Sequence, residues 1–458
     1  MTITPRRPPS RSGRARTIRP AAPSPAHTAR PAPTRARARH AAEPAALPEV
    51  AAPAPVDGGR KGTRRAPRSY LGAAVLRCAL YLGPLSVAVA GGESLGQVPW
   101  PVPLATLLLG WSAAQALTFA GVTVARRAGV AAGCRLVGAG FTAVGALWCA
   151  LVWIAPDALL GPERWLALVV GLGGLATLAT VTAALVTRAE AAVVGWCVPC
   201  WALAAAALAA LNGHPVPSVP IGRLLPDAIL VAGHPMPPLP IGTLLPAAIV
   251  VALVRAFRPA MICGSRRPIR LTRPQLRRAA AYLVIGASQA ISVGLVWRAG
   301  PSGSTAPFWL PLLLAVPILE ALIGWSTEAG PRRRGVATVT LAGLLPPLAL
   351  GVALALVAAR TEARAEVLAL AAGTLLGGVF AVTYLLAARG RTGIAATVAI
   401  AAPLLTVALK IIPLTVTLKI LPLTATGPLP DAVGALAVTH LAGLLAVALT
   451  AADHRRTS

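Results

Sequence analysis

Acidic residues are scarce in this chain: 14 Asp and Glu stand against 42 Lys and Arg in 458 residues, giving a formal net charge of +28. Charged residues make up 12% of the sequence and aromatic residues 4%. A soluble domain is roughly a quarter charged. Together with 56% hydrophobic residues and a mean hydropathy of +0.71, this composition excludes an ordinary soluble domain and indicates a membrane protein.

Cysteines and catalytic motifs are also few. The six cysteines are scattered, which excludes a disulfide framework. The sequence has no P-loop, dinucleotide fingerprint, HExxH or GxSxG, and no metal-ligand spacing. Cys197 and Cys200, between Trp196 and Trp201, are similar to the WCxPC motif of thioredoxin-type oxidoreductases. They lie inside an apolar span, which favours simple packing around a proline kink. We expect no enzyme activity, no cofactor and no metal.

The positive charge is dispersed, which argues against a nucleic-acid-binding face. Residues 1–69 hold 15 Lys and Arg against three acids, with much Pro and Ala, which predicts a disordered cytoplasmic tail. A polybasic tail attracts anionic lipid headgroups. The simpler interpretation, which we favour, is a solvated tail without such a role.

Apolar runs dominate the rest of the chain. A membrane-spanning helix needs about 20 apolar residues. Twelve runs meet this length, which predicts an all-α bundle of 12 transmembrane helices: 71–90, 102–124, 136–155, 165–187, 191–211, 240–257, 279–297, 306–326, 336–358, 366–387, 393–412 and 431–451. The segment 255–278 carries eight arginines and no acid, and it divides the runs six and six.

The distribution of Lys and Arg predicts the orientation, because these residues favour cytoplasmic loops. With the tail inside, the even-numbered loops and the C-terminus hold 19 of them, against five in the odd-numbered loops. Both termini are therefore expected in the cytoplasm. The heavy use of Ala, Arg, Pro and Gly favours a high-GC bacterium, and thus a bacterial plasma membrane.

Four regions follow: the tail 1–69, a six-helix half at 70–254, the basic loop 255–278, and a second six-helix half at 279–458. Residues 213–232 and 233–252 form a tandem repeat with 14 of 20 positions identical, interpreted as an outer-face insertion followed by the sixth span. Residues 409–417 and 418–426 form a shorter repeat. Duplication without a role is the favoured explanation. The alternative is a metal or ligand site formed by His214, His234 and Asp227.

Ionisable residues at membrane depth are the candidate functional residues, because each must be paired or face water. Glu320 and Arg77 lie at about the same depth in their spans, and Arg135 starts the third span at a similar level. We expect Glu320 to pair with Arg77 or Arg135, either as a structural pair or as a gating or coupling group. His440, near the middle of the last span, is expected to be a neutral imidazole bonded to a neighbouring helix, or a proton relay.

Further mid-span groups add to this set. Gln289, with Gln115 and Tyr384, is expected to form hydrogen bonds between helices or to line a pathway. Gly373 and Gly377 form a Gly-x-x-x-Gly surface on which another helix can pack closely. The substrate or coupling candidates are Glu320, Arg77, Arg135, His440 and Gln289.

Many spans, a few buried polar groups and no hydrolytic motif are typical of a transporter or flippase that moves a small solute or lipid-linked precursor. Twelve spans divided by a basic loop is also the organisation of major-facilitator-type transporters, but the loop GVTVARRAG after the second span lacks their usual acid, so no family is assigned. The alternative is a non-transporting membrane scaffold. The lipid bilayer is the expected partner, nucleic acid is not, and the sequence names no protein partner.

Overall fold

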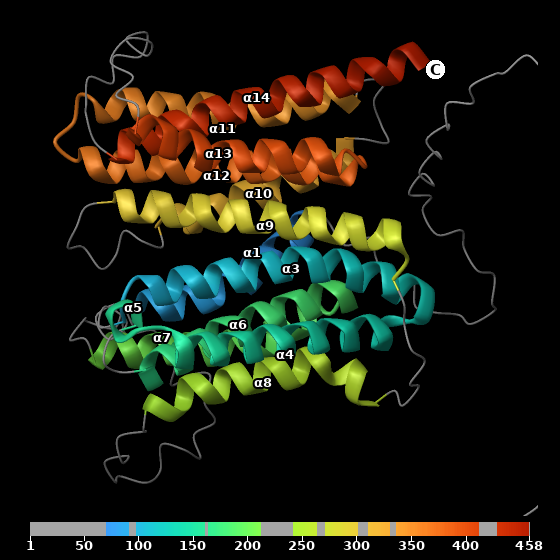
Figure 1. The fold of residues 1–458 in the computed structure, drawn as a ribbon, viewed down its shortest axis with the longest axis vertical. Helices are drawn as coiled ribbons and strands as arrows, with labels where there is room; N and C mark the ends of the chain where they lie inside the picture. Colours follow the sequence, from blue (N-terminus) through green and yellow to red (C-terminus); the bar gives the residue numbers. More distant parts are fainter. Residues whose placement is uncertain are drawn as a thin grey trace, which may run out of the picture. The chain divides into compact units, whose positions relative to one another are not determined.

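The computed structural model describes residues 70–90, 98–160, 164–211, 241–262, 271–300, 310–329, 336–411 and 428–457. Within these ranges the secondary structure is helical, without strands (Figure 1). The first six long helices, here the first set, are α1 (Tyr70–Ala90), α3 (Pro101–Ala128), α4 (Val130–Ile154), α6 (Arg164–Thr187), α7 (Glu190–Leu211) and α8 (Ile241–Ile262). The second set is α9 (Arg273–Ala299), α10 (Leu310–Ala329), α11 (Val336–Ala358), α12 (Arg364–Ala388), α13 (Thr392–Ile411) and α14 (Pro428–Thr457). A short helix, α5 (Asp157–Leu160), joins α4 to α6.

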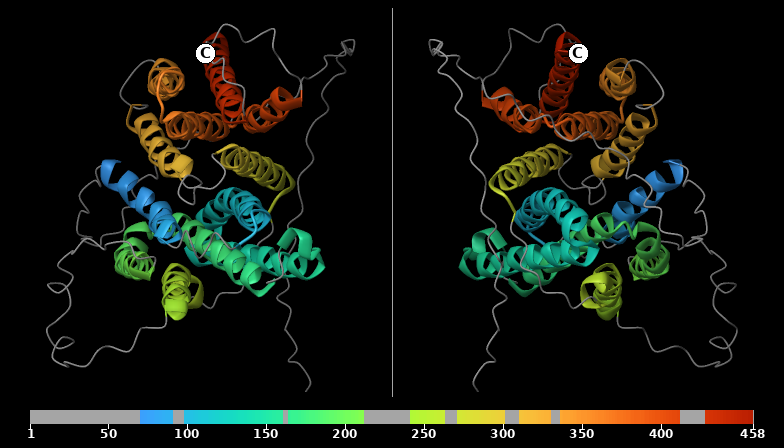
Figure 2. Two further views of the ribbon diagram at one scale, coloured as in Figure 1. Left: turned by 90° about the vertical axis from the view of Figure 1, so that its left-hand side faces the viewer. Right: turned by 90° about the vertical axis from the view of Figure 1, so that its right-hand side faces the viewer.

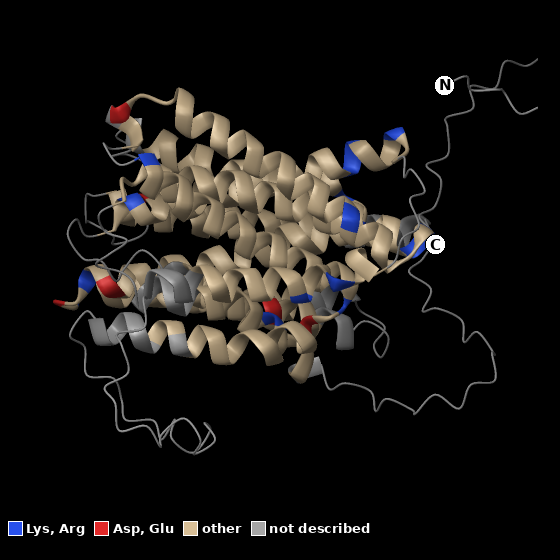
Figure 3. Ribbon diagram, turned by 90° about the horizontal axis from the view of Figure 1, so that it is seen from below, with Lys and Arg blue, Asp and Glu red and all other residues tan. Residues whose placement is uncertain are grey.

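These helices are built to cross a bilayer. Eight of those described, α3, α4, α6, α9, α11, α12, α13 and α14, have the length and apolar composition of membrane spans, and α7 and α10 contain shorter apolar stretches. Charged residues gather mainly at the helix ends (Figure 3). Large apolar side chains such as Trp153, Ile154 and Leu404 are exposed on the outer faces. The predicted all-α multi-pass membrane fold is confirmed, and each of the 12 expected spans overlaps one long helix.

The basic segment 255–278, expected to be a loop, is helical at both ends. Helix α8 continues to Ile262, and α9 starts at Arg273. The backbone N–H of Thr272 donates to Oε1 of Gln275 at 3.0 Å, half of a capping box that starts α9 six residues before the expected 279. Hydropathy marks only the lipid-embedded part of a helix, whereas capping marks where the helix begins. The tail 1–69 lies outside the described residues. Both repeats also lie outside them, apart from residues 241–252 of the first repeat and 409–411 of the second.

The two sets repeat one pattern of helix packing. In the first set α3, α4 and α6 pack on one another, α8 packs on α4, α6 and α7, and α1 packs on α7. In the second set α10, α11 and α12 pack on one another, α14 packs on α11, α12 and α13, and α9 packs on α13. Each contact of the first set therefore has its counterpart six spans later. The repetition is not evident from the sequence.

Two helix pairs join the sets. Helix α3 lies against α9, and α1 lies against α10, as the end-on views show (Figure 2). If each helix is replaced by its counterpart six spans away, the α3–α9 pair becomes the α10–α1 pair, so the two pairs are equivalent. Helices α6 and α12 occupy equivalent inner positions, and 50% and 78% of their apolar windows are buried. We call the contact region of α1, α3, α9, α10 and the adjacent face of α12 the seam.

Candidate functional site

An ion pair crosses the seam between α1 and α10. Nε of Arg77 donates to Oε2 of Glu320 at 2.6 Å, although the two residues are 243 positions apart in the sequence. The Glu320 side chain is 6% exposed and the Arg77 side chain 24%. A charge at this depth needs a partner, because lipid offers none. Of the two partners expected for Glu320, the structure thus places Arg77 against it.

Arg135 lies elsewhere. It is near the start of α4, a helix that packs on α3, α6 and α8. A second ion pair, Arg164 with Asp157 at 2.8 Å, lies at the start of α6, and the Asp157 side chain is 68% exposed. The Arg77–Glu320 pair, in contrast, combines burial with a position between the two sets.

Aromatic side chains gather along the same seam. Tyr81 lies one helical turn after Arg77, and its ring is 5.9 Å from that of Trp111 on α3. The Trp111 ring is in turn 6.3 Å from Phe380 on α12. Tyr384 follows Phe380 by four positions and so lies one helical turn after it on α12. Tyr384 on α12 is 43% exposed.

A hydrogen-bonded chain crosses the seam at Gln289 on α9. Nε1 of Trp111 donates to Oε1 of Gln289 at 2.9 Å, and Nε2 of Gln289 donates to Oγ1 of Thr383 on α12 at 3.0 Å. The Thr383 hydroxyl then donates to the backbone carbonyl of Phe380 at 2.9 Å. Both ends of the buried Gln289 amide are thereby satisfied. The expected bonding of Gln289 between helices is found, and it joins α3 of the first set to two helices of the second.

The contact between α3 and α9 is close along most of their length. The indole of Trp100 lies 4.6 Å from the guanidinium of Arg298 at one end. Farther along, Phe119 and Tyr282 stack with their centroids 4.9 Å apart. Between them, a Cβ on Gly286 would lie 2.8 Å from Cα of Ser112, so the absence of a side chain permits this approach. The α3–α9 pair is thus fixed by packing, whereas the contact of α1 with α10 includes the Arg77–Glu320 ion pair.

His440 on α14 is fully buried, away from the seam contacts. Its ring lies on Gly378 of α12, where glycine leaves room for it. The backbone of Leu344 on α11 is nearby, but neither ring nitrogen has a hydrogen-bond partner among the described residues. A hydrogen bond from His440 to a neighbouring helix stays a prediction, with the nearby backbone of Leu344 as the candidate partner.

The remaining sequence candidates stay apart from the seam. Cys197 and Cys200 are free thiols within the single helix α7, and Cys200 bonds weakly to the carbonyl of Trp196 at 3.7 Å. His214, His234 and Asp227 lie outside the described residues. Among those described, no group of three or more His, Cys, Asp and Glu side chains is placed to hold a metal ion. Gly377 does pack closely, as expected, because its missing Cβ would lie 2.9 Å from the Ala315 carbonyl on α10.

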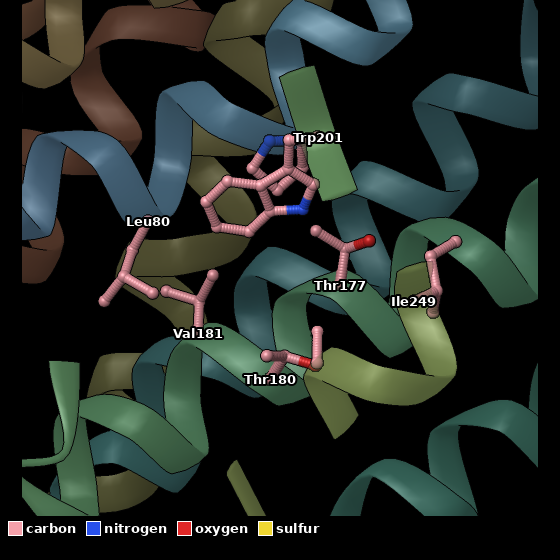
Figure 4. A pocket seen from close by; sticks show the side chains of 8 residues that line it. Leu80, Thr177, Thr180, Val181, Trp201 and Ile249 are labelled. Atoms are coloured by element: carbon pink, nitrogen blue, oxygen red, sulfur yellow. The ribbon is translucent and has the colours of Figure 1, made fainter. Parts of the chain in front are cut away.

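A small cavity lies within the first set, one turn along α1 from Tyr81 (Figure 4). Its lining includes Leu80, Pro84, Thr177, Thr180 and Trp201, and its volume is about 10 Å³. This is room for about one water molecule. Pro84 has no N–H to donate to the Leu80 carbonyl, so a water could satisfy that group. The cavity is too small for a substrate.

Sequence reasoning missed the aromatic part of the seam. The sequence marks Tyr384 only as a polar mid-span group, and it does not single out Tyr81, Trp111 or Thr383. One signal was available: in a chain with 4% aromatic residues, Tyr81 follows Arg77 by four positions and so shares its helix face. No such signal connects Trp111 or Thr383 with them, because those residues lie on other helices.

The comparisons with known proteins are distant. No protein-family model matches the sequence, and no curated protein matches it significantly. Among solved structures, the chain is similar to a crystal structure of a MATE P26A mutant, with TM-score 0.48 and 13% identity over 84% of this chain and 96% of the other. It is also similar to an inward-facing multidrug resistance MATE family transporter of the MOP superfamily, with TM-score 0.46 and 13% identity over 86% and 98%. Similarity at this level assigns neither a family nor an activity.

Proposed function

We propose that this multi-pass membrane protein is a transporter or flippase that moves a small solute or lipid-linked precursor by alternating access between its two helix sets. The observation that supports it most is the Arg77–Glu320 ion pair, which joins α1 of one set to α10 of the other. Ionisable groups at membrane depth mark substrate or ion pathways. An ion pair that spans two similarly packed sets is placed where their relative movement would break and re-form it.

The repeated packing supports the same proposal. Transporters commonly consist of two structurally repeated halves, with the substrate site between them near the middle of the membrane. We propose that residues 70–254 and 279–458 are these halves, joined by the basic segment 255–278. Glu320, Arg77 and Gln289 would be contacts for substrate or coupling at the seam. Arg135 and His440 would act indirectly, because they belong to α4 and α14, which are not among the helices that join the two sets.

The cellular setting is part of the proposal. We place the protein in the plasma membrane with both termini in the cytoplasm, because Lys and Arg concentrate in the loops assigned to that side. The basic tail and loops would lie near anionic lipid headgroups. Transport needs no catalytic residue, and we assign none.

Water access to the seam tests the proposal. In a variant free of native cysteines, Tyr384→Cys should react with a membrane-impermeant maleimide added to either side of reconstituted vesicles, because alternating access exposes the seam to both. Val382→Cys is the matched control on the same helix, since Val382 is fully buried within the second set. It should react from neither side.

The scaffold alternative gives a different result. A seam sealed between helices would leave Tyr384→Cys unreactive, and a fixed cavity would let it react from one side only. Either result would contradict alternating access.

A further inference from the structure

We propose that Arg255 and Arg258 on α8 bind the phosphate of an anionic phospholipid at the surface of the bilayer. This inference goes beyond the proposed function and does not depend on transport. It concerns the end of α8 that leads into the basic segment 255–278. It follows from a buried donor without a partner, from charges of one sign around it, and from the order of residues along one face of the helix.

Arg255 carries a charged donor that the described part of the protein does not satisfy. Its Nε is buried and has no hydrogen-bond partner among the described residues. The guanidinium is always protonated, so a buried N–H without an acceptor is costly. The Arg255 side chain as a whole is half-buried, so a change of rotamer can bring Nε to the surface of the helix. An anion bound there would remove the cost.

The charges near Arg255 are positive. Helix α8 packs on α4 (Figure 1), and Sγ of Cys134 lies 3.8 Å from the carbonyl oxygen of Ala256. This contact brings the start of α4 to the end of α8, so Arg135, which follows Cys134, adds a positive charge at the same level. Neither α4 nor α8 contains an acidic residue. The ligand that suits this place is therefore an anion.

The order of residues along α8 indicates that the anion belongs to a lipid. Val251, Arg255 and Arg258 are four and three positions apart, so they share one face of the helix. Val251, Val254 and Arg258 are exposed. Exposed apolar side chains thus lie toward the middle of the span, and the arginines follow toward its end. A phospholipid has the same order, with acyl chains in the bilayer and a phosphate at its surface.

The chemistry of arginine suits a phosphate. Nε–H and one Nη–H of a guanidinium point in the same direction, so they can donate to two oxygens of one phosphate. Arg258 can supply a second guanidinium to the same headgroup. A headgroup that also carries an ammonium would bring a like charge to these arginines. We therefore expect an anionic phospholipid to bind more tightly than a zwitterionic one.

Lipid binding by the purified full-length protein in detergent tests the proposal. Native mass spectrometry would compare phosphatidylglycerol, which is anionic, with phosphatidylcholine of the same acyl chains. We expect phosphatidylglycerol to bind at least about tenfold more tightly. Glycerol phosphate, which carries the phosphate without acyl chains, would be added as a competitor. At the same concentration as the lipid it should not displace it, because the exposed apolar face of α8 contributes to binding.

Substitutions separate a defined site from a general attraction to basic surfaces. Arg258→Gln changes an exposed side chain, so it should fold, and it should weaken phosphatidylglycerol binding about fivefold. Arg255→Gln combined with Arg258→Gln should weaken it about 20-fold. The matched control is Arg126→Gln with Arg127→Gln, which removes two exposed arginines from the last turn of α3. The control should bind phosphatidylglycerol nearly as tightly as the wild type.

Three results would overturn the inference. Equal binding of phosphatidylglycerol and phosphatidylcholine would show that the site does not select an anion. Equal losses in the α8 variants and in the α3 control would show a general attraction to positive charge. Displacement of the lipid by glycerol phosphate would show that the arginines take a free anion. If the double variant on α8 does not fold, Arg258→Gln alone is compared with the control.

Discussion

Arg77 and Glu320 show how a single side chain constrains a membrane protein at the residue scale. Each lies in an apolar helix, where an isolated charge is expensive. The cost predicts that a partner exists at the same depth, and the sequence places both residues there. It does not select between Arg77 and Arg135, because both are arginines at similar levels on different helices. The packing of α1 on α10 makes that choice.

We predict that Arg77→Gln and Glu320→Gln each lower the free energy of unfolding by about 3 kcal/mol, the lower end of the cost of breaking a buried pair, because the Arg77 side chain is 24% exposed. In a double-mutant cycle the two losses should not add, and the coupling energy between Arg77 and Glu320 should be at least about 1 kcal/mol. Denaturant unfolding in mixed micelles measures the free energies of the four variants. The exposed pair Arg164 and Asp157 is the control, with an expected coupling below about 1 kcal/mol. Additive losses at Arg77 and Glu320 would show that the pair contributes nothing.

His440 and Gln289 are two buried polar residues that should respond oppositely to the same substitution. His440→Leu removes two ring nitrogens that have no described hydrogen-bond partner, so we predict an unchanged or higher unfolding midpoint. Gln289→Leu leaves the indole of Trp111 and the hydroxyl of Thr383 short of a partner, and it should cost about 1–3 kcal/mol. Thermal unfolding in detergent compares them. A clear loss of stability in His440→Leu would mean that the imidazole has a bonded role.

At the scale of elements, the α3–α9 pair differs from the α1–α10 pair. Stacked rings, a cation–π contact and a glycine approach fix α3 against α9 along most of the pair. The contact of α1 with α10 includes a buried ion pair. A close-packed pair is suited to act as a pivot, and an ion pair is suited to act as a latch that opens.

The glycine contact gives a prediction for the α3–α9 pair. Gly286→Ala would place a Cβ 2.8 Å from Cα of Ser112, so the helices must move apart, and we expect a loss of about 1–3 kcal/mol. Gly195→Ala on α7 is the matched control, because nothing lies within 4 Å of its added Cβ. That variant should be neutral, or more stable by up to about 1 kcal/mol. Equal effects of the two changes on thermal unfolding would argue against the close approach of α3 and α9.

At the scale of the whole molecule, we expect equivalent ends of α1 and α9 to lie on the same side of the bilayer, because six crossings separate the two helices. We propose the orientation, with both termini in the cytoplasm, from the distribution of Lys and Arg.

The orientation can be tested at two exposed arginines, Arg360 just before α12 and Arg391 just after it. In a background without native cysteines, Arg360→Cys should react with a membrane-impermeant maleimide in intact cells. Arg391→Cys should react only after the membrane is permeabilised. Gel mobility after labelling reads out both, and the reverse pattern would invert the proposed topology.

The sequence by itself determined the class of protein and the approximate position of each long helix. These depend on properties of single segments: the length of an apolar run, and the cost of a charge within it. The sequence placed the start of α9 too late, at residue 279. Thr272 and Gln275 cap the helix in a polar stretch, and hydropathy detects only the apolar run that follows.

Only the tertiary structure decided which helices meet, and therefore that Arg77 binds Glu320, that Trp111 meets Gln289, and that His440 has no described partner. Lipid is as apolar as the side chains of these helices, so hydrophobicity does not indicate which face of a helix turns toward a neighbour. That face is decided by small residues such as Gly286 and by a few polar contacts, and their partners lie far away in the sequence. The site is for this reason a property of the packed bundle.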